Sequence, residues 1–124
     1  MIRQNQFDQN PRLLSLTMAN NLIENFHVNT FVSNVNLEVL DFGNNQITSL
    51  PGTLLRANGR LVSLGMRRNG ITAIQNNFFN NLPNLRFINL QTNECVNQFF
   101  SNNRGFAVDV APFLDSCFRN FSLL

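Results

Sequence analysis

The stretch LVSLGMRRNGI at residues 61–71 decides the fold, because its apolar positions and its asparagine recur at a fixed spacing. Its first position is held by leucines that lie 24 residues apart: Leu13, Leu37, Leu61 and Leu85. The fourth position is Leu16, Leu40, Leu64 and Ile88, and the sixth is Met18, Phe42, Met66 and Leu90. The ninth is asparagine in every copy: Asn21, Asn45, Asn69 and Asn93. Such self-similarity indicates a stacked repeat protein.

The eleventh position completes the pattern with Ile23, Ile47, Ile71 and then Cys95. These columns together match L-x-x-L-x-L-x-x-N-x-L, so the chain resembles the leucine-rich repeat family over nearly its whole length. The resemblance implies an α/β solenoid, a horseshoe segment with a short parallel sheet on its concave face. It also implies a mostly irregular convex side and a small helical C-terminal cap. Because one copy cannot bury its own leucines, neighbouring copies must stack to form the core.

The second half of each copy also carries apolar residues at fixed columns. The fourteenth position is Phe26, Leu50 and Ile74, and the nineteenth is Phe31, Leu55 and Phe79. These residues predict a convex-side spine and are similar to the 24-residue class of animal extracellular repeat proteins. The twenty-second position departs from that class, being Asn34 and Asn58 before Leu82. We expect looser packing at this column.

The columns divide the chain into repeats at residues 13–36, 37–60 and 61–84, the start of a fourth at 85–95, and a cap at 96–124. Residues 1–12 lack the pattern of a secretory signal. They look like the tail of an earlier copy, because Ile2 and Phe7 fall on the fourteenth and nineteenth columns. Two interpretations remain open. Either the chain is the downstream part of a longer protein, or it begins with an uncapped end through which it self-associates.

The recurrent asparagines Asn21, Asn45, Asn69 and Asn93 are predicted to form an asparagine ladder. Each turns the chain out of its strand, and its side-chain amide can satisfy backbone groups that the bend leaves buried. We therefore expect Asn69→Ala to cost roughly 1–3 kcal/mol. A change at Asn76, which we expect to be exposed, should cost little.

Two cysteines, Cys95 and Cys117, indicate a cap closed by a disulfide, similar to the two-cysteine caps of small secreted insect repeat proteins. A short helix is expected after Val108, with Val110, Phe113, Leu114 and Cys117 on one face. Disulfides persist in oxidising compartments, so the pair favours a secreted or extracellular chain. The alternative is a cytosolic protein with two reduced, buried thiols. The one glycosylation sequon begins at Asn120.

Catalytic chemistry has little support in the sequence. The single histidine, His27, lies in a convex segment without a second imidazole for a metal site or a nucleophile to activate. The carboxylates of Glu38 and Asp41 are strand neighbours with no sign of a closed pocket. We predict no enzymatic activity, no catalytic residue, no cofactor and no metal site.

A binding surface is the more informative prediction. Strand alternation turns the third, fifth and seventh residues of each copy toward the concave face. The first of these rows is Ser15, Val39, Ser63 and Phe87, the second Thr17, Asp41, Gly65 and Asn89, and the third Ala19, Gly43, Arg67 and Gln91. The predicted partner-binding residues are Val39, Asp41, Arg67, Arg68, Phe87, Asn89 and Gln91. An exposed aromatic beside an arginine is the usual composition of an interface anchor. The alternative is that Phe87 is an ordinary surface aromatic.

Charge adds a second observation. The chain has nine basic residues, all arginine, against seven acidic ones, for a net charge of +2. Between Asp41 and Glu94 there is no acid, but there are five arginines: Arg56, Arg60, Arg67, Arg68 and Arg86. This local charge suits an acidic protein partner or a sulfated glycan, with a plain solvated face as the alternative. Nucleic acid is not expected, because neither a basic groove motif nor a stacking series is present. No stretch is apolar enough to span a membrane.

Two functions follow as hypotheses. The first is a secreted or ectodomain module that recognises another protein through its concave face, as the resemblance to extracellular immune and developmental repeat proteins implies. The second is a structural part, the capping end of a longer receptor or scaffold with no ligand contacts of its own. The upstream sequence discriminates between the two. The partner itself lies beyond the sequence.

Overall fold

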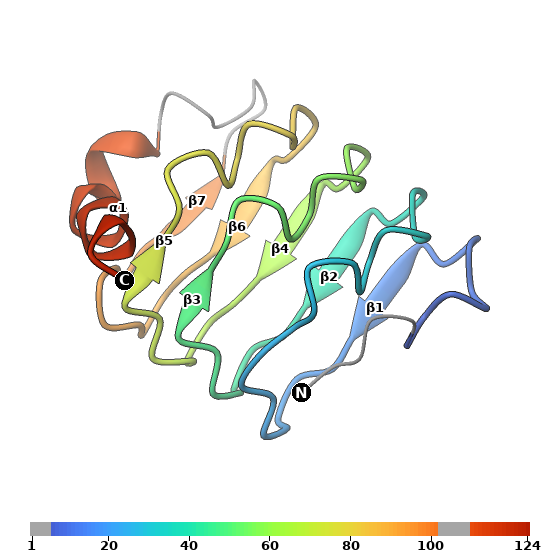
Figure 1. The fold of residues 1–124 in the computed structure, drawn as a ribbon, viewed down its shortest axis with the longest axis horizontal. Coiled ribbons are helices and arrows are strands. Elements are labelled where there is room, and N and C mark those ends of the chain that lie inside the picture. Colours follow the sequence, from blue (N-terminus) through green and yellow to red (C-terminus); the bar gives the residue numbers. More distant parts are fainter. Residues whose placement is uncertain (1–5, 102–109) are drawn as a thin grey trace.

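The computed structural model describes residues 6–101 and 110–124 of the chain. Its elements are seven short strands followed by two short helices (Figure 1). The strands are β1 (Ser15–Thr17), β2 (Val39–Asp41), β3 (Ser49–Leu50), β4 (Ser63–Gly65), β5 (Ala73–Ile74), β6 (Phe87–Asn89) and β7 (Phe99–Ser101). The helices are the 3-10 turn η1 (Ala111–Phe113) and α1 (Asp115–Ser122).

Five strands form the main sheet in the order β1-β2-β4-β6-β7 (Figure 1). The first four are parallel and come one from each repeat. Their register pairs Ser15 with Val39, Val39 with Ser63 and Ser63 with Phe87, which agrees with the first predicted row. The fifth strand, β7, runs antiparallel to β6. No sequence pattern predicted it.

A second, two-stranded sheet lies on the other side of the solenoid, where β3 and β5 pair in parallel. Leu50 faces Ile74 in this pair, so the fourteenth column supplies strand residues on the convex side. Turns make up most of the remaining convex segments. The two sheets enclose a layer of apolar side chains that belongs to no single repeat.

The core is deepest in repeats 2 and 3. Leu37, Leu40, Leu61 and Leu64 are almost fully buried, whereas Leu16 of repeat 1 is only half-buried. The difference follows from position, because β1 has a neighbouring strand on one side among the described residues. Before repeat 1, the ring of Phe7 stacks on Phe31 with centroids 5.8 Å apart.

The asparagine ladder links repeats 2, 3 and 4 each to the one before it, whereas the hydrogen bonds of Asn21 among the described residues stay within its own turn. The Asn69 amide nitrogen donates to the carbonyl oxygens of Met66 at 3.0 Å and Phe42 at 3.1 Å, while its oxygen accepts the Ile47 N–H at 3.2 Å. Asn45 repeats this arrangement one copy earlier, on Ile23, Phe42 and Met18. Each amide thus joins two neighbouring turns.

The asparagines of the twenty-second column, Asn34 and Asn58, are fully buried. The looser packing expected at this column stays a prediction. Asn58 Nδ2 donates to the carbonyl oxygens of Phe31 at 3.1 Å and Asn34 at 2.9 Å. Asn34 Nδ2 donates in the same way to Phe7 and Asn10. A polar side chain can replace the leucine of this column because its amide ties two adjacent turns together. We call Asn34 and Asn58 the convex asparagine pair.

The C-terminal part closes the end of the solenoid. A disulfide joins Cys95 to Cys117, with Cα atoms 5.2 Å apart, and α1 packs against β5. Val110 and Leu114 are buried as expected, but Phe113 is 56% exposed. Phe113 ends the 3-10 turn, whose geometry differs from the α-helical spacing assumed for it, and its ring lies beside Phe100. The expected start of the helix, Val108, lies outside the described residues.

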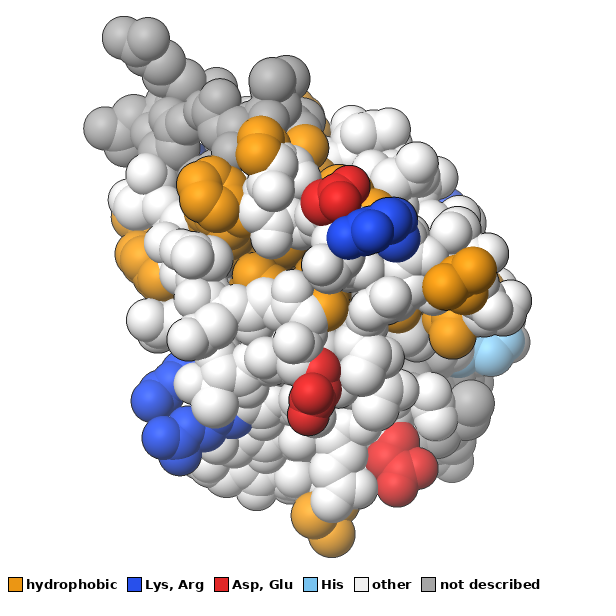
Figure 2. Space-filling model, turned by 90° about the vertical axis from the view of Figure 1, so that its left-hand side faces the viewer, with side chains coloured by type: hydrophobic (Ala, Val, Ile, Leu, Met, Phe, Trp, Pro, Cys, Tyr) orange, Lys and Arg blue, Asp and Glu red, His pale blue; other side chains and the backbone are white. Residues whose placement is uncertain are grey.

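Figure 2 shows this end of the molecule, where charged side chains are few and scattered and hydrophobic ones gather in the upper part of the view. The sequon residue Asn120 lies within α1, and its amide nitrogen donates to the Thr72 carbonyl at 2.9 Å. This hydrogen bond occupies the nitrogen atom to which a glycan would be joined. In the described part of the chain, no helix combines the length and apolar character needed to cross a membrane.

Candidate functional site

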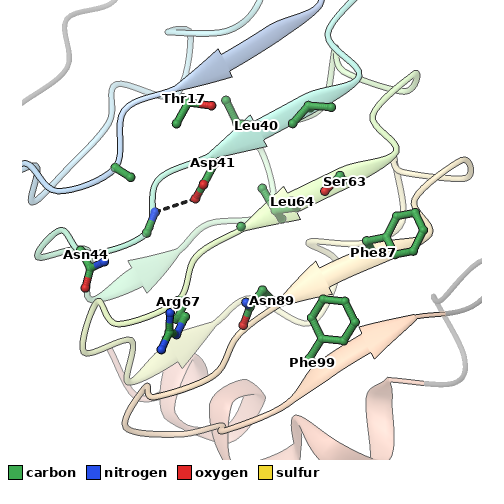
Figure 3. A pocket seen from close by; sticks show the side chains of 14 residues that line it. Thr17, Leu40, Asp41, Asn44, Ser63, Leu64, Arg67, Phe87, Asn89 and Phe99 are labelled. Carbon is green, nitrogen blue, oxygen red and sulfur yellow. Dashed lines mark hydrogen bonds between the residues drawn. The ribbon is translucent and has the colours of Figure 1, made fainter.

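The concave face carries a hollow of about 370 Å³, lined by residues from all five strands of the main sheet or from the turns that follow them (Figure 3). Of the predicted partner-binding residues, Val39, Asp41, Arg67, Phe87 and Asn89 line it. The strand register explains why they meet, because each row crosses neighbouring strands about 4.8 Å apart. Arg68 and Gln91 do not line the hollow.

The floor of the hollow is formed by small residues on β4. Ser63 lies between Val39 and Phe87 in the register, and Gly65 lies between Asp41 and Asn89. A Cβ atom at Gly65 would come within 2.7 Å of the Asp41 Oδ1. Glycine at this position therefore makes room for the Asp41 carboxylate to lean across β4.

The carboxylate of Asp41 is held by a hydrogen bond from the turn that follows its strand. Its Oδ1 accepts the N–H of Gly43 at 2.9 Å, the dashed contact of Figure 3. Asn89 makes the equivalent bond two copies later, accepting the N–H of Gln91 at 3.0 Å. A carboxylate has further acceptor sites besides the one used here. Asp41 is thus both a structural acceptor and a charged group available to a ligand.

Phe99 also lines the hollow, although no sequence pattern predicted it there. It lies opposite Asn89 because β7 folds back antiparallel to β6. The side chain of Phe99 is 51% exposed and that of Phe87 is 40% exposed, and Figure 3 shows both rings at the β6 and β7 side of the hollow. The hollow therefore presents two exposed aromatic rings rather than the one predicted. Antiparallel pairing at the end of a parallel sheet has no counterpart in the repeat pattern, so the repeat could not reveal it.

The arginines fall into two groups. Arg60 donates to Asn36 Oδ1 at 3.0 Å, Arg56 donates to the Val28 carbonyl and to Asn29, and Arg86 is engaged as well. Arg56 and Arg60 hold neighbouring parts of the chain, and with Arg86 also engaged, all three are less available to a glycan than their sequence clustering indicates. Two other arginines, Arg67 and Arg68, are exposed and have no side-chain partner among the described residues.

Arg68 occupies an unusual backbone position. Its φ is 57°, and the same column has positive φ at Asn20, Asn44 and Thr92. Asparagine adopts this left-handed conformation more readily than other residues, whereas arginine and especially threonine are strained there. The turn after each strand therefore imposes its conformation whichever residue occupies this column.

Elsewhere the titratable groups are dispersed. His27 Nδ1 accepts the N–H of Asn29 at 3.1 Å in its convex turn. Among residues 6–101 and 110–124, no cluster of histidine, cysteine or acidic residues could hold a metal ion. The concave hollow is the place where exposed aromatic and charged groups converge.

The fold is a stack of repeats with a parallel sheet along one face, and the hollow on that face carries exposed aromatic and charged side chains. No protein-family model and no curated protein matches the chain. Solved structures do match it. One is the Toll–Spatzle complex, described as a molecular hub in Drosophila development and innate immunity, with a TM-score of 0.72 and 27% sequence identity over 75% of this chain. Another is the TLR13–ssRNA13 complex, with a TM-score of 0.63 and 33% identity over 65% of this chain.

The matched proteins are leucine-rich repeat ectodomains and are much longer than this chain. The match covers 13% of the first structure's chain and 11% of the second's. The chain therefore shares the leucine-rich repeat fold of these proteins and corresponds to a small part of their length.

Proposed function

We propose that the chain is a non-enzymatic recognition module, secreted or part of an extracellular ectodomain, that binds a protein partner through the concave hollow. One observation carries the proposal. Two exposed phenylalanines on adjacent strands, Phe87 and Phe99, border a floor of small residues. At its end lies Arg67, whose side chain has no partner within residues 6–101 and 110–124. Aromatic residues and arginine are the side chains that most often dominate protein interfaces.

The matched proteins support recognition as the function, because one is in a complex with the protein Spatzle and the other in a complex with ssRNA. We favour a protein partner for this chain. The hollow contains the carboxylate of Asp41, which would repel phosphates, and three of the five clustered arginines are held by other contacts. The same engagement of arginines argues against a sulfated glycan.

The Cys95–Cys117 disulfide supports an extracellular location, since such bonds persist in oxidising compartments. The 24-residue repeat class and the two-cysteine cap, as extracellular features of the sequence, agree with this location. Glycosylation at Asn120 remains a prediction. Its test is the mass of the tryptic peptide after enzymatic removal of N-glycans from secreted material.

The test of the function is capture of a partner from a native extract by the immobilised chain. The double variant Phe87→Ala with Arg67→Glu should lose the captured protein without lowering the melting temperature, because both side chains are exposed. A matched control, Leu22→Ala with Arg12→Glu, truncates an exposed apolar residue and reverses a charge outside the hollow. The control should bind like the unmodified chain.

The alternative is a structural capping piece that binds nothing itself. It predicts that no protein is retained by the unmodified chain, or that the double variant and the control retain the same proteins equally well. Either result would refute the recognition proposal.

A further inference from the structure

The shape of the hollow restricts what can occupy it, and this inference rests on the proposed function. Ser63 and Gly65 form a floor one strand wide between walls on β2 and β6. Because neighbouring strands lie about 4.8 Å apart, the backbones of β2 and β6 are about 10 Å apart across this floor. The hollow as a whole crosses all five strands of the main sheet. We call the strip of the hollow that lies above β4 the trough.

The chemistry of the trough changes in order along β4. At the level of Ser63 the walls are the apolar side chains of Val39 and Phe87. One step further, at Gly65, the Asp41 carboxylate leans over the floor. Beyond the end of the strand stands the Arg67 guanidinium, exposed and unpaired among the described residues.

These three levels are separated by two residues each, or about 6.6 Å along a strand. An extended peptide repeats its side chains on one side at the same interval. The spacing of the trough thus matches alternate side chains of a peptide that lies along β4. An α-helix, which advances about 1.5 Å per residue, places successive side chains of one face at a different interval.

We propose that the trough binds an extended segment of the partner with three alternate side chains of defined chemistry. The first is apolar and fills the space between Val39 and Phe87. The second is basic or carries an amide, and donates to the Asp41 carboxylate. The third is acidic and pairs with Arg67. Charge complementarity selects this occupant over a uniformly acidic or uniformly apolar one.

A peptide array tests this proposal with the purified, disulfide-bonded chain as the probe. Extended peptides that vary three alternate positions should be retained best with apolar, basic or amide, and acidic residues in that order or its reverse. The Arg67→Glu variant should change the third preference from acidic to basic. This change of specificity is not expected from a general loss of folding.

A second measurement uses a variant whose larger side chain fills the trough. Ser63→Trp should weaken binding of the best array peptide, measured by fluorescence anisotropy, by about tenfold or more, which corresponds to about 1.4 kcal/mol. Ser15→Trp is the matched control, because Ser15 occupies the same row one repeat before Val39 and does not line the hollow. The control should bind like the unmodified chain.

Failure of this inference is distinguishable from failure of the proposed function. If no array peptide binds, or if bound peptides share no alternate pattern, while a folded protein is still captured through Phe87 and Arg67, the trough proposal is overturned and the recognition function stands. If a single-stranded oligoribonucleotide binds in place of peptides, both are overturned. If Ser63→Trp and Ser15→Trp bind equally, the trough is not the site.

Discussion

Replacing Asn69 with alanine tests the asparagine ladder at its most connected position. The Asn69 amide nitrogen donates to the carbonyl oxygens of Phe42, Met66 and Arg67, and its oxygen accepts the Ile47 N–H. The structure shows which backbone groups would lose every hydrogen-bond partner in the alanine variant and which would keep one. Each of the three carbonyls keeps another donor, from Asn45 Nδ2, Asn93 Nδ2 and the Asn44 N–H respectively.

The Ile47 N–H has no such replacement among the described residues, and Ile47 is 1% exposed. A buried polar group without a partner costs about 1–3 kcal/mol. The three carbonyl oxygens, which each lose one of their donors, add to this cost. We therefore expect Asn69→Ala to lower the free energy of unfolding by about 2–3 kcal/mol. For a chain of this length the melting temperature should fall by about 8 to 12 °C.

The assay is reversible denaturation by urea, followed by circular dichroism and repeated as a thermal melt. Asn76→Ala is the control, since Asn76 is exposed, and it should change stability by less than about 0.5 kcal/mol. Asn21→Ala should cost less than Asn69→Ala, because Asn21 is exposed and its hydrogen bonds among the described residues stay within its own turn. Equal stability of the Asn69 and Asn76 variants would refute the reasoning.

The double variant Asn45→Ala with Asn69→Ala extends the same test. The Phe42 carbonyl accepts from both side chains, so each single variant leaves it one donor and the double variant leaves it none. The loss should exceed the sum of the single losses by about 1 kcal/mol. Simple additivity would show that the shared carbonyl does not couple the two repeats.

Three further changes have expected outcomes. Asn58→Asp should cost about 3–5 kcal/mol at neutral pH, because a buried carboxylate would face two carbonyl oxygens, and acidic urea melts should show part of this loss recovered on protonation. Thr92→Asn should raise stability by about 1 kcal/mol in the same melts, since asparagine relieves the strain of φ 59°. Reducing the Cys95–Cys117 disulfide should add two hydrogens to the intact mass and cost about 3 kcal/mol of stability. For Asn58→Asp, an unchanged urea midpoint would contradict the expectation. For Thr92→Asn, an unchanged or lower midpoint would do so. For the disulfide, an unchanged mass after reduction would do so.

The repeat pattern was sufficient to predict the order and register of the parallel strands. A leucine framework with a fixed period leaves little freedom, because a one-residue slip would turn every core side chain outward. Val39, Asp41, Phe87 and Asn89 therefore fall in the rows that the sequence predicts. The same rows predict where exposed side chains meet on the concave face.

Features that the columns of the repeat do not describe could not be predicted in this way. β7 and its exposed Phe99 arise where the chain leaves the repeat, and their pairing with β6 depends on a return of the chain that no column encodes. The burial of the convex asparagine pair could not be predicted from residue type, because it depends on hydrogen bonds from Asn34 and Asn58 to carbonyl groups of the preceding turn. The contacts of Arg56 likewise depend on a turn about one repeat away.

The central claim is that the core belongs to stacked repeats whose strands line one concave face. X-ray diffraction from crystals of the chain tests it most directly. We expect parallel strands with Ser15, Val39, Ser63 and Phe87 in one row, and the leucines of neighbouring repeats packed against one another. A compact bundle, in which each segment packs its own leucines without a parallel sheet, would contradict the account.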